Sequence, residues 1–263
     1  MNKIIGVLLL LPVLVWGQDF EVAPIKLNFN ADPGESQTRV VTIKNHSSKR
    51  SSFILSMGDY RINSKGEKEY LSASSTKTSI AQWITISPSF FDLNPNEEKE
   101  VSVSLQAPFD DFSSRWGVIY VRTTEEQTGF TADKVLSAGI GVSARIAIIV
   151  QQSPRSNVNI SVKINRLQEI GQITDSIRTF TATIENTGEK ITRCKVYLIA
   201  SNLQTYKETQ FEPILFETYP KTAQQIELSL PKKLDKGAYA LAAVLDYGSK
   251  TNLEGTQIII NVP

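Results

Sequence analysis

The sequence is poor in the residues on which most enzyme chemistry depends. It contains one histidine, His46, and one cysteine, Cys194, among 263 residues. A single histidine in the polar turn "KNHSSK" argues against a catalytic triad and against a metal site built on several histidines. A single cysteine cannot form an internal disulfide, and its strand-like surroundings, "TRCKVYLIA", predict a buried structural thiol.

Other signatures of chemistry are missing as well. No paired-carboxylate motif stands out, and the glycine-containing stretch "SAGIGVSA" lacks the lysine and the helix start of a phosphate-binding loop. The formal net charge is only +1, so neither nucleic acid nor an anionic bilayer is an expected partner. We therefore expect no enzyme, no catalytic residue, no metal and no cofactor.

Long hydrophobic runs are absent except at the start of the chain. The segment "MNKIIGVLLLLPVLVWGQ" combines one lysine, a run of about twelve apolar residues and the small residue Gly17. This pattern predicts a signal peptide over residues 1–17, cleaved near Gly17, because a membrane anchor needs about twenty apolar residues. The mature protein is accordingly expected in the periplasm, with no membrane span after cleavage.

What the chain does contain is strand-type alternation from end to end. Short runs of β-branched and aromatic residues are separated by polar turns, with no convincing helix. The plan also repeats, because "VTIKNHSSKRSSFIL" (41–55) is matched by "ATIENTGEKITRCKVYL" (182–198), and "NPNEEKEVSVSLQAP" (94–108) by "YPKTAQQIELSLPKK" (219–233). We predict an all-β protein of two tandem immunoglobulin-like β-sandwich domains, at 18–152 and 155–263.

One segment in the second copy has a specific structural meaning. In "LDKGAY", a turn glycine precedes Tyr239 at the start of a strand. This is the pattern of a tyrosine corner, in which the tyrosine hydroxyl bonds back to the preceding turn.

The last strand of the first copy, "VLSAGIGVSARIAIIV", is unusually long at about sixteen residues against a usual five or six. Its even-numbered positions are all apolar, whereas the odd-numbered positions from Ser137 to Ser143 are small and are followed by Arg145. Because side chains alternate along a strand, Arg145 is expected on the face away from the apolar one, near the inter-domain junction. A strand that outruns its sheet presents an unpaired edge, which is usually hidden unless it pairs with another chain.

These features resemble the N-terminal domain of the periplasmic pilus chaperones (PapD-like). The resemblance lies in "FEVAPIKLNFNADPGESQTRVVTIKNHSSKRSSFIL", in "ISPSFFDLNPNEEKEVSVSL" and in "RWGVIYVR" followed by a variable loop and an alternating strand. It implies that the last strand is lent to an incomplete subunit, here through Leu136, Ile140 and Val142. It also implies that two basic residues in the inter-domain cleft, here Lys26 and Arg145, anchor the subunit's C-terminal carboxylate.

The sequence also departs from that family. The family's anchoring lysine in the last strand aligns best with Ala147, and the second copy, with "LDKGAY" and "VLDYG", is closer to fibronectin-like repeats. Two functions therefore stay open. The first is a chaperone-like protein that binds and stabilises a secreted or surface-fibre subunit by strand donation. The second is a non-enzymatic cell-envelope adaptor or structural subunit of a surface or secretion assembly. The role of Arg145 also stays open: it either holds a client's carboxylate or pairs with an acidic side chain of the second domain as a structural latch.

Overall fold

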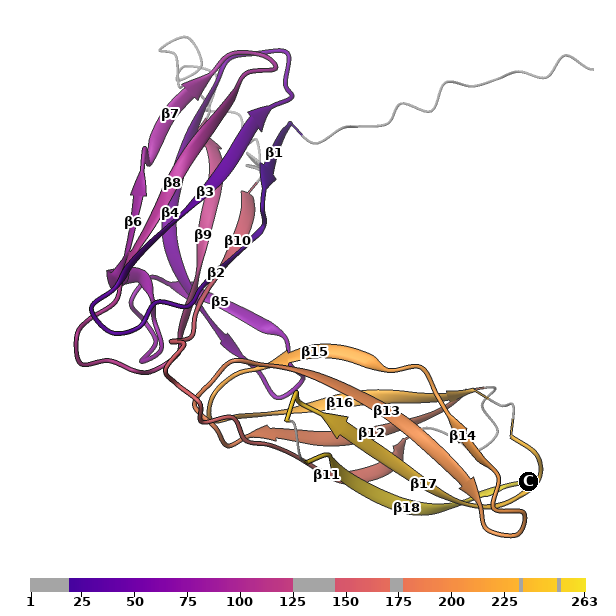
Figure 1. The fold of residues 1–263 in the computed structure, drawn as a ribbon. Helices are drawn as coiled ribbons and strands as arrows, with labels where there is room; N and C mark the ends of the chain where they lie inside the picture. The colour runs from indigo at the N-terminus through magenta and orange to yellow at the C-terminus, as the bar shows by residue number, and fades with distance from the viewer. Residues whose placement is uncertain (1–18, 125–144, 171–176, 232–233, 250–251) are drawn as a thin grey trace, which may run out of the picture.

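Two β-sandwiches follow each other along the chain (Figure 1). The computed structural model describes residues 19–124, 145–170, 177–231, 234–249 and 252–263. Within these ranges every regular element is a strand, apart from one 3-10 turn at Ala81–Trp83. The predicted fold class, two tandem immunoglobulin-like β-sandwiches, is confirmed. The predicted signal peptide at 1–17 lies outside the described residues.

The first sandwich packs two sheets face to face. Sheet 1 has the order β1-β3-β8-β6, with bounds Phe20–Ala23, Ser36–Asn45, Glu98–Gln106 and Ile84–Ser87. Sheet 2 has the order β2-β10-β9-β4-β5, with bounds Lys26–Phe29, Arg145–Gln152, Arg115–Thr124, Ser51–Ile62 and Lys68–Ser72, and β7 (Phe90–Leu93) pairs with β4. The chain crosses from sheet 1 to sheet 2 between β1 and β2, which puts β2 beside β10.

The second sandwich repeats this plan with its own two sheets. Sheet 3 has the order β11-β12-β16, with bounds Val162–Ile170, Ile177–Asn186 and Thr222–Pro231. Sheet 4 has the order β14-β13-β17-β18, with bounds Glu208–Gln210, Thr192–Asn202, Gly237–Asp246 and Glu254–Val262, and β15 (Ile214–Thr218) also pairs with β13.

Alternating apolar residues build a separate core between the sheets of each sandwich, as expected for strands with one face buried. The first core includes Leu27, Val41, Ile43, Phe53, Val101, Val103, Val121, Ile148 and Val150. The second core includes Phe180, Ile184, Cys194, Val196, Leu198, Leu228, Leu241, Ala243 and Leu245.

The internal repeat read from the sequence corresponds to one turn built twice. Asn45 and Asn186 end β3 and β12, and each side chain donates to the carbonyl four residues later, at 2.8 Å and 3.0 Å. Each main-chain carbonyl also accepts a hydrogen bond of 2.9 Å, from the backbone N–H of Asn96 in the first domain and of Lys221 in the second. Both donors have a positive φ, 62° and 57°, so the turns match in backbone conformation as well.

The tyrosine corner predicted at Tyr239 is confirmed. Its hydroxyl donates to the carbonyl of Asp235 at 2.9 Å, while the ring is buried in the second core. Cys194 is also buried in that core, as predicted, and burial raises the pKa of its thiol to about 11.

The two sandwiches meet at a bend (Figure 1). A third apolar cluster lies there, and we call it the elbow cluster; its buried members are Tyr60, Trp116, Val118, Tyr120 and Tyr219. The first four belong to β4 and β9 of the first domain, whereas Tyr219 comes from the second. The turn between β4 and β5 also reaches the second domain, because the backbone N–H of Gln225 in β16 donates to the carbonyl of Ser64 at 2.8 Å.

Candidate partner-binding site

Strand β10 leaves part of one edge open. It pairs with β9 along its whole described length, but β2 pairs only with its second half, Ile149–Gln152. The backbone N–H of Ile149 donates to the carbonyl of Ile25 at 2.9 Å, so the odd-numbered residues of β10 direct their backbone groups toward β2. No strand of the described chain continues β2 beside Arg145–Ile148, which therefore forms an open sheet edge there.

The side chains of β10 separate onto two faces, as the alternation predicted. Ile146, Ile148 and Val150 pack in or against the first core. Ala147 and Ile149 pack against the elbow cluster, and Arg145 is exposed on the same side. The other predicted contact residues of this strand, Leu136, Ile140 and Val142, lie outside the described residues.

Arg145 lies over an aromatic ring at the rim of a groove. Its guanidinium carbon is 4.0 Å from the centre of the Tyr120 ring, a cation–π contact. The groove, of about 430 Å³, is lined by Met57, Tyr70, Leu71, Ser72, Tyr120 and Arg145. Burial raises the pKa of the Tyr120 phenol, and the charge of Arg145 partly offsets this, so the phenol stays neutral at physiological pH.

A second arginine stands next to Arg145. Arg122 in β9 is its register partner, so the two side chains leave the sheet on the same face. Both are exposed, and neither has a carboxylate partner within the described part of the chain. Like charges placed opposite each other repel, and an anionic ligand would relieve that repulsion. Two adjacent cations of this kind are suited to an anionic ligand such as a carboxylate.

Lys26 does not share this site. It pairs in register with Ile149, four residues from Arg145, which separates the two cations by about 13 Å along the strand direction. The Lys26 ammonium instead forms an ion pair of 2.5 Å with Glu217 of the second domain. The expected convergence of Lys26 and Arg145 is therefore absent from the structure, because strand register sets them too far apart.

Glu217 gathers donors from both domains. Besides Lys26, it accepts a hydrogen bond of 3.0 Å from the side-chain amide of Gln151, and Arg193 lies 3.6 Å away. Burial alone would raise the pKa of Glu217, but the hydrogen bonds and charges around it outweigh burial and hold the pKa below its ordinary value. The inter-domain latch that the sequence allowed at Arg145 is thus made by Lys26 and Glu217 instead.

The residue of β10 that contacts the acidic side chain of the second domain is Gln151, whereas the sequence allowed this contact for Arg145. Gln151, rather than Arg145, is the residue of β10 whose side chain hydrogen-bonds to the second domain, where its amide also donates to the hydroxyl of Tyr219 at 2.7 Å. Six residues separate it from Arg145, about 20 Å along an extended strand. Arg145 consequently lies in the half of β10 that is remote from the second domain.

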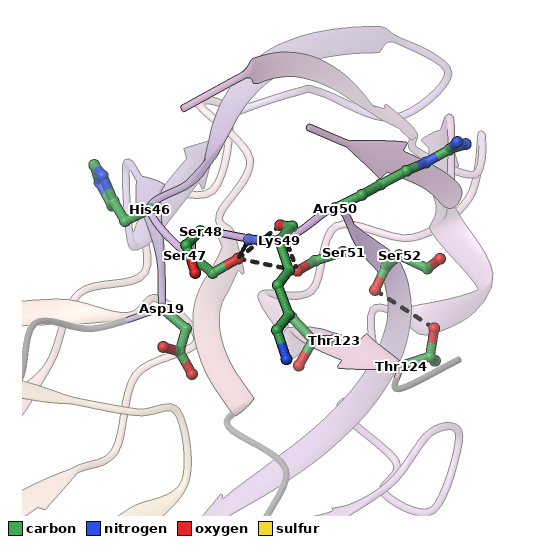
Figure 2. A pocket seen from close by; sticks show the side chains of 10 residues that line it. All are labelled: Asp19, His46, Ser47, Ser48, Lys49, Arg50, Ser51, Ser52, Thr123 and Thr124. Atoms are coloured by element: carbon green, nitrogen blue, oxygen red, sulfur yellow. Dashed lines mark hydrogen bonds between the residues drawn. The ribbon is translucent and has the colours of Figure 1, made fainter. Parts of the chain in front are cut away.

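A further hollow lies at the end of the first sandwich remote from the second domain. It encloses about 820 Å³ between Asp19, the turn 46–52 and the end of β9 at Thr123 and Thr124. Figure 2 shows Lys49 reaching across it, whereas His46 and Arg50 point away, each held by an acidic residue. The lining is mainly serine and threonine hydroxyls.

Within the residues that the structure describes, no three His, Cys, Asp or Glu side chains gather as metal ligands would. The same residues contain no helix with the length and apolar character to span a membrane.

Comparison with known proteins places the fold. No protein-family model and no curated protein sequence matches the chain. Among solved structures, the chain is similar to one from a chaperone–tip adhesin complex vital for synergistic activation of CFA/I fimbriae biogenesis. The TM-score is 0.51 at 13% sequence identity, and the match covers 94% of this chain and 100% of that one.

Two further structures are similar over comparable lengths. The class 5 fimbriae chaperone CfaA has a TM-score of 0.49 at 13% identity, covering 93% of this chain and 99% of that one. A chain of the CsuC–CsuE chaperone–tip adhesion subunit pre-assembly complex of Acinetobacter baumannii has a TM-score of 0.47 at 11% identity, covering 90% and 97%. The structure from the chaperone–tip adhesin complex, at a TM-score of 0.51, shows that the chain shares its two-sandwich fold, and coverage of 94% extends the likeness beyond the first domain into the second.

Proposed function

We propose that this protein is a non-enzymatic, chaperone-like protein of the periplasm that binds and stabilises a secreted or surface-fibre subunit by donating strand β10 to it. The open edge along Arg145–Ile148 is the observation that carries this proposal. An exposed edge with unpaired backbone groups is a template for pairing with another chain. The shared fold with fimbrial chaperones and the signal-like N-terminus support the same proposal.

The proposed contact divides into backbone pairing and side-chain recognition. Backbone groups of Arg145 and Ala147 point toward the open edge and would continue a ladder with a client strand, which gives affinity. Three apolar residues precede this edge in the sequence at even-numbered positions, as Ile148 does: Leu136, Ile140 and Val142. Their side chains would fill a groove in the client.

The proposed anchor for a client's carboxylate is Arg145 together with Arg122. Charge-assisted hydrogen bonds from a guanidinium to a carboxylate are among the stronger polar contacts in proteins. Lys26 is less suited to this role than the resemblance implied, because Glu217 already occupies its ammonium group. Arg145 is exposed and free of such a partner within the described residues.

A proline in the open edge tests strand donation most directly. The N–H of Ala147 points away from β9, so Ala147→Pro removes a donor to the client while every β9–β10 hydrogen bond stays in place. We expect Ala147→Pro to keep the wild-type melting temperature within a few degrees and to lose the client. The measurement is co-purification from the periplasm followed by mass spectrometry, with Glu100→Ala on the outer face of sheet 1 as a control.

The same preparation tests the anchor and the alternative function. Arg145→Ala and Arg122→Ala should each reduce client recovery, and the double variant should abolish it. Retention of an incomplete-sandwich client by folded Ala147→Pro would refute donation of this edge. A permanent stoichiometric complex with an envelope component, insensitive to Ala147→Pro, would favour the adaptor instead.

A further inference from the structure

The outer faces of the two sheets in the second domain differ in chemistry. On sheet 3, Ile177 is exposed, but most outward side chains are polar, as is usual for a sheet with one face in water. They include Thr179, Thr183, Glu185, Gln225, Glu227 and Ser229. On sheet 4, strand β17 is apolar at every position from Ala238 to Leu245.

Half of those apolar residues belong to the core and half do not. Tyr239, Leu241, Ala243 and Leu245 are buried between the sheets. The intervening side chains point outward and stay half-exposed, and neighbouring strands extend the same surface. We call this surface the sheet 4 face; its members are Tyr197, Ile199, Ala238, Ala240, Ala242, Val244 and Ile259.

Continuous apolar character on both faces is typical of strands that are covered on both sides. A contiguous exposed apolar patch on a soluble protein commonly marks an interaction surface. The sheet 4 face is centred on β13 and β17, which are flanked by β14, β15 and β18 (Figure 1).

The outward side chains of β13 and β17, the two central strands of this face, differ in size and in the sign of their charge. Tyr197 and Ile199 of β13 lie in register with the smaller Val244 and Ala242 of β17. At the end of the face nearer the first domain, Lys195 lies in register with Asp246. The large residues and the cation are thus on β13, and the small residues and the anion on β17.

We infer that the sheet 4 face binds a second copy of this chain about a two-fold axis that runs along the strands, between β13 and β17. This operator lays β13 of each copy on β17 of the other. Large side chains then meet small ones, and Lys195 of each copy meets Asp246 of the other. Within one chain the Lys195 ammonium lies 5.7 Å from the centre of the Tyr197 ring, and the Asp246 carboxylate accepts a hydrogen bond of 2.9 Å from the backbone N–H of Gly248. Neither contact neutralises the charge of either residue.

The size of the face sets the strength expected of this dimer. Four strands about 4.8 Å apart and four rows of outward residues about 6.7 Å apart give roughly 500 Å² per copy. That is about 1,000 Å² in total, at the lower limit for a specific interface. We therefore expect a weak, reversible dimer that dissociates on dilution.

Sedimentation velocity of the purified protein over a dilution series tests this. The wild type should shift from monomer to dimer with rising concentration. Ala242→Glu, at the centre of the face, should stay monomeric at every concentration. Thr183→Glu, at the matching central position of the sheet 3 outer face, should behave as the wild type. Melting temperatures of both variants check that they fold.

Exchanging the charges at positions 195 and 246 gives a second, independent test of the dimer. Lys195→Asp alone and Asp246→Lys alone place like charges together in each homodimer, and both should be monomeric. An equimolar mixture should form a heterodimer, because every Lys then meets an Asp across the axis. A wild type that is monomeric throughout, or a mixture that does not associate, overturns the inference. A monomer that loses a co-purified client on Ala242→Glu would assign the face to that client and also overturn it.

Discussion

Removing the Tyr219 hydroxyl should destabilise the inter-domain junction more than removing that of its hydrogen-bond partner, Tyr60. The two hydroxyls are 3.0 Å apart in the buried elbow cluster, and the Tyr219 oxygen also accepts from the Gln151 amide at 2.7 Å. Burial raises the pKa of both phenols, that of Tyr219 to about 12, so both stay protonated at physiological pH. The network is therefore neutral, and its energy is that of hydrogen bonds.

The two substitutions leave different groups unpaired. Tyr219→Phe leaves the Tyr60 hydroxyl and one N–H of Gln151 without a hydrogen-bond partner. Each buried unpaired group costs about 1–3 kcal/mol, so we expect a loss of about 2–6 kcal/mol. Tyr60→Phe leaves Tyr219 bonded to Gln151 and should cost about 1 kcal/mol. In the double variant, Tyr60→Phe removes a hydroxyl that is already unpaired, and it should restore part of the stability lost in Tyr219→Phe.

Urea unfolding followed by tryptophan fluorescence measures these differences. The ring of Trp116 packs edge-on against Tyr219 with 5.1 Å between centroids, so its emission reports directly on the junction. Because each domain has its own core, the transition that involves the junction is compared between variants by its midpoint and slope. Equal losses for the two single variants, or an additive double variant, would refute a network centred on Tyr219.

Three further predictions follow from single side chains. Glu217→Gln should remove an acid-sensitive contribution to stability, because Lys26 and the other donors depress the pKa of Glu217 below its ordinary 4.5. The wild type has this stability in full above pH 4.5 and loses it as the pH falls through the depressed pKa. The difference in melting temperature between the wild type and Glu217→Gln should therefore shrink as the pH falls. Cys194 should resist a thiol-specific reagent at pH 8 in the native protein and react at once in urea, since its buried thiol has a pKa of about 11. Tyr239→Phe should lower stability by about 1 kcal/mol through loss of the bond to Asp235, measured by urea unfolding.

Features that depend on local sequence chemistry could be predicted. An asparagine between two strand patterns specifies its own turn through side-chain bonds to neighbouring backbone, which is why 41–55 and 182–198 gave the same structure. The Tyr239 corner is equally local, because its partner lies four residues away. The parity of β10 was predictable as well, since alternation needs only the strand itself.

Features that depend on register between distant strands could not be predicted. Arg122 faces Arg145 only because β9 and β10 pair with one particular offset, which the sequence between them does not reveal. A tyrosine and arginine alternating in "YVR" was the available signal that Arg122 shares a face with Tyr120. The contact of Lys26 with Glu217 joins residues 191 positions apart and follows from how the domains dock.

Strand β10 connects the open edge to the second domain, and this bears on how a client would be held. Its first half, Arg145–Ile148, has the unpaired edge, whereas Gln151 in its second half donates to both Glu217 and Tyr219. A rigid strand with one end fixed in this way presents its edge at a set angle to the second domain. Gln151→Leu removes both bonds and leaves the edge intact, so it should weaken client binding without altering the backbone groups that pair. Undiminished recovery of the client by folded Gln151→Leu would show that the edge binds independently of the second domain.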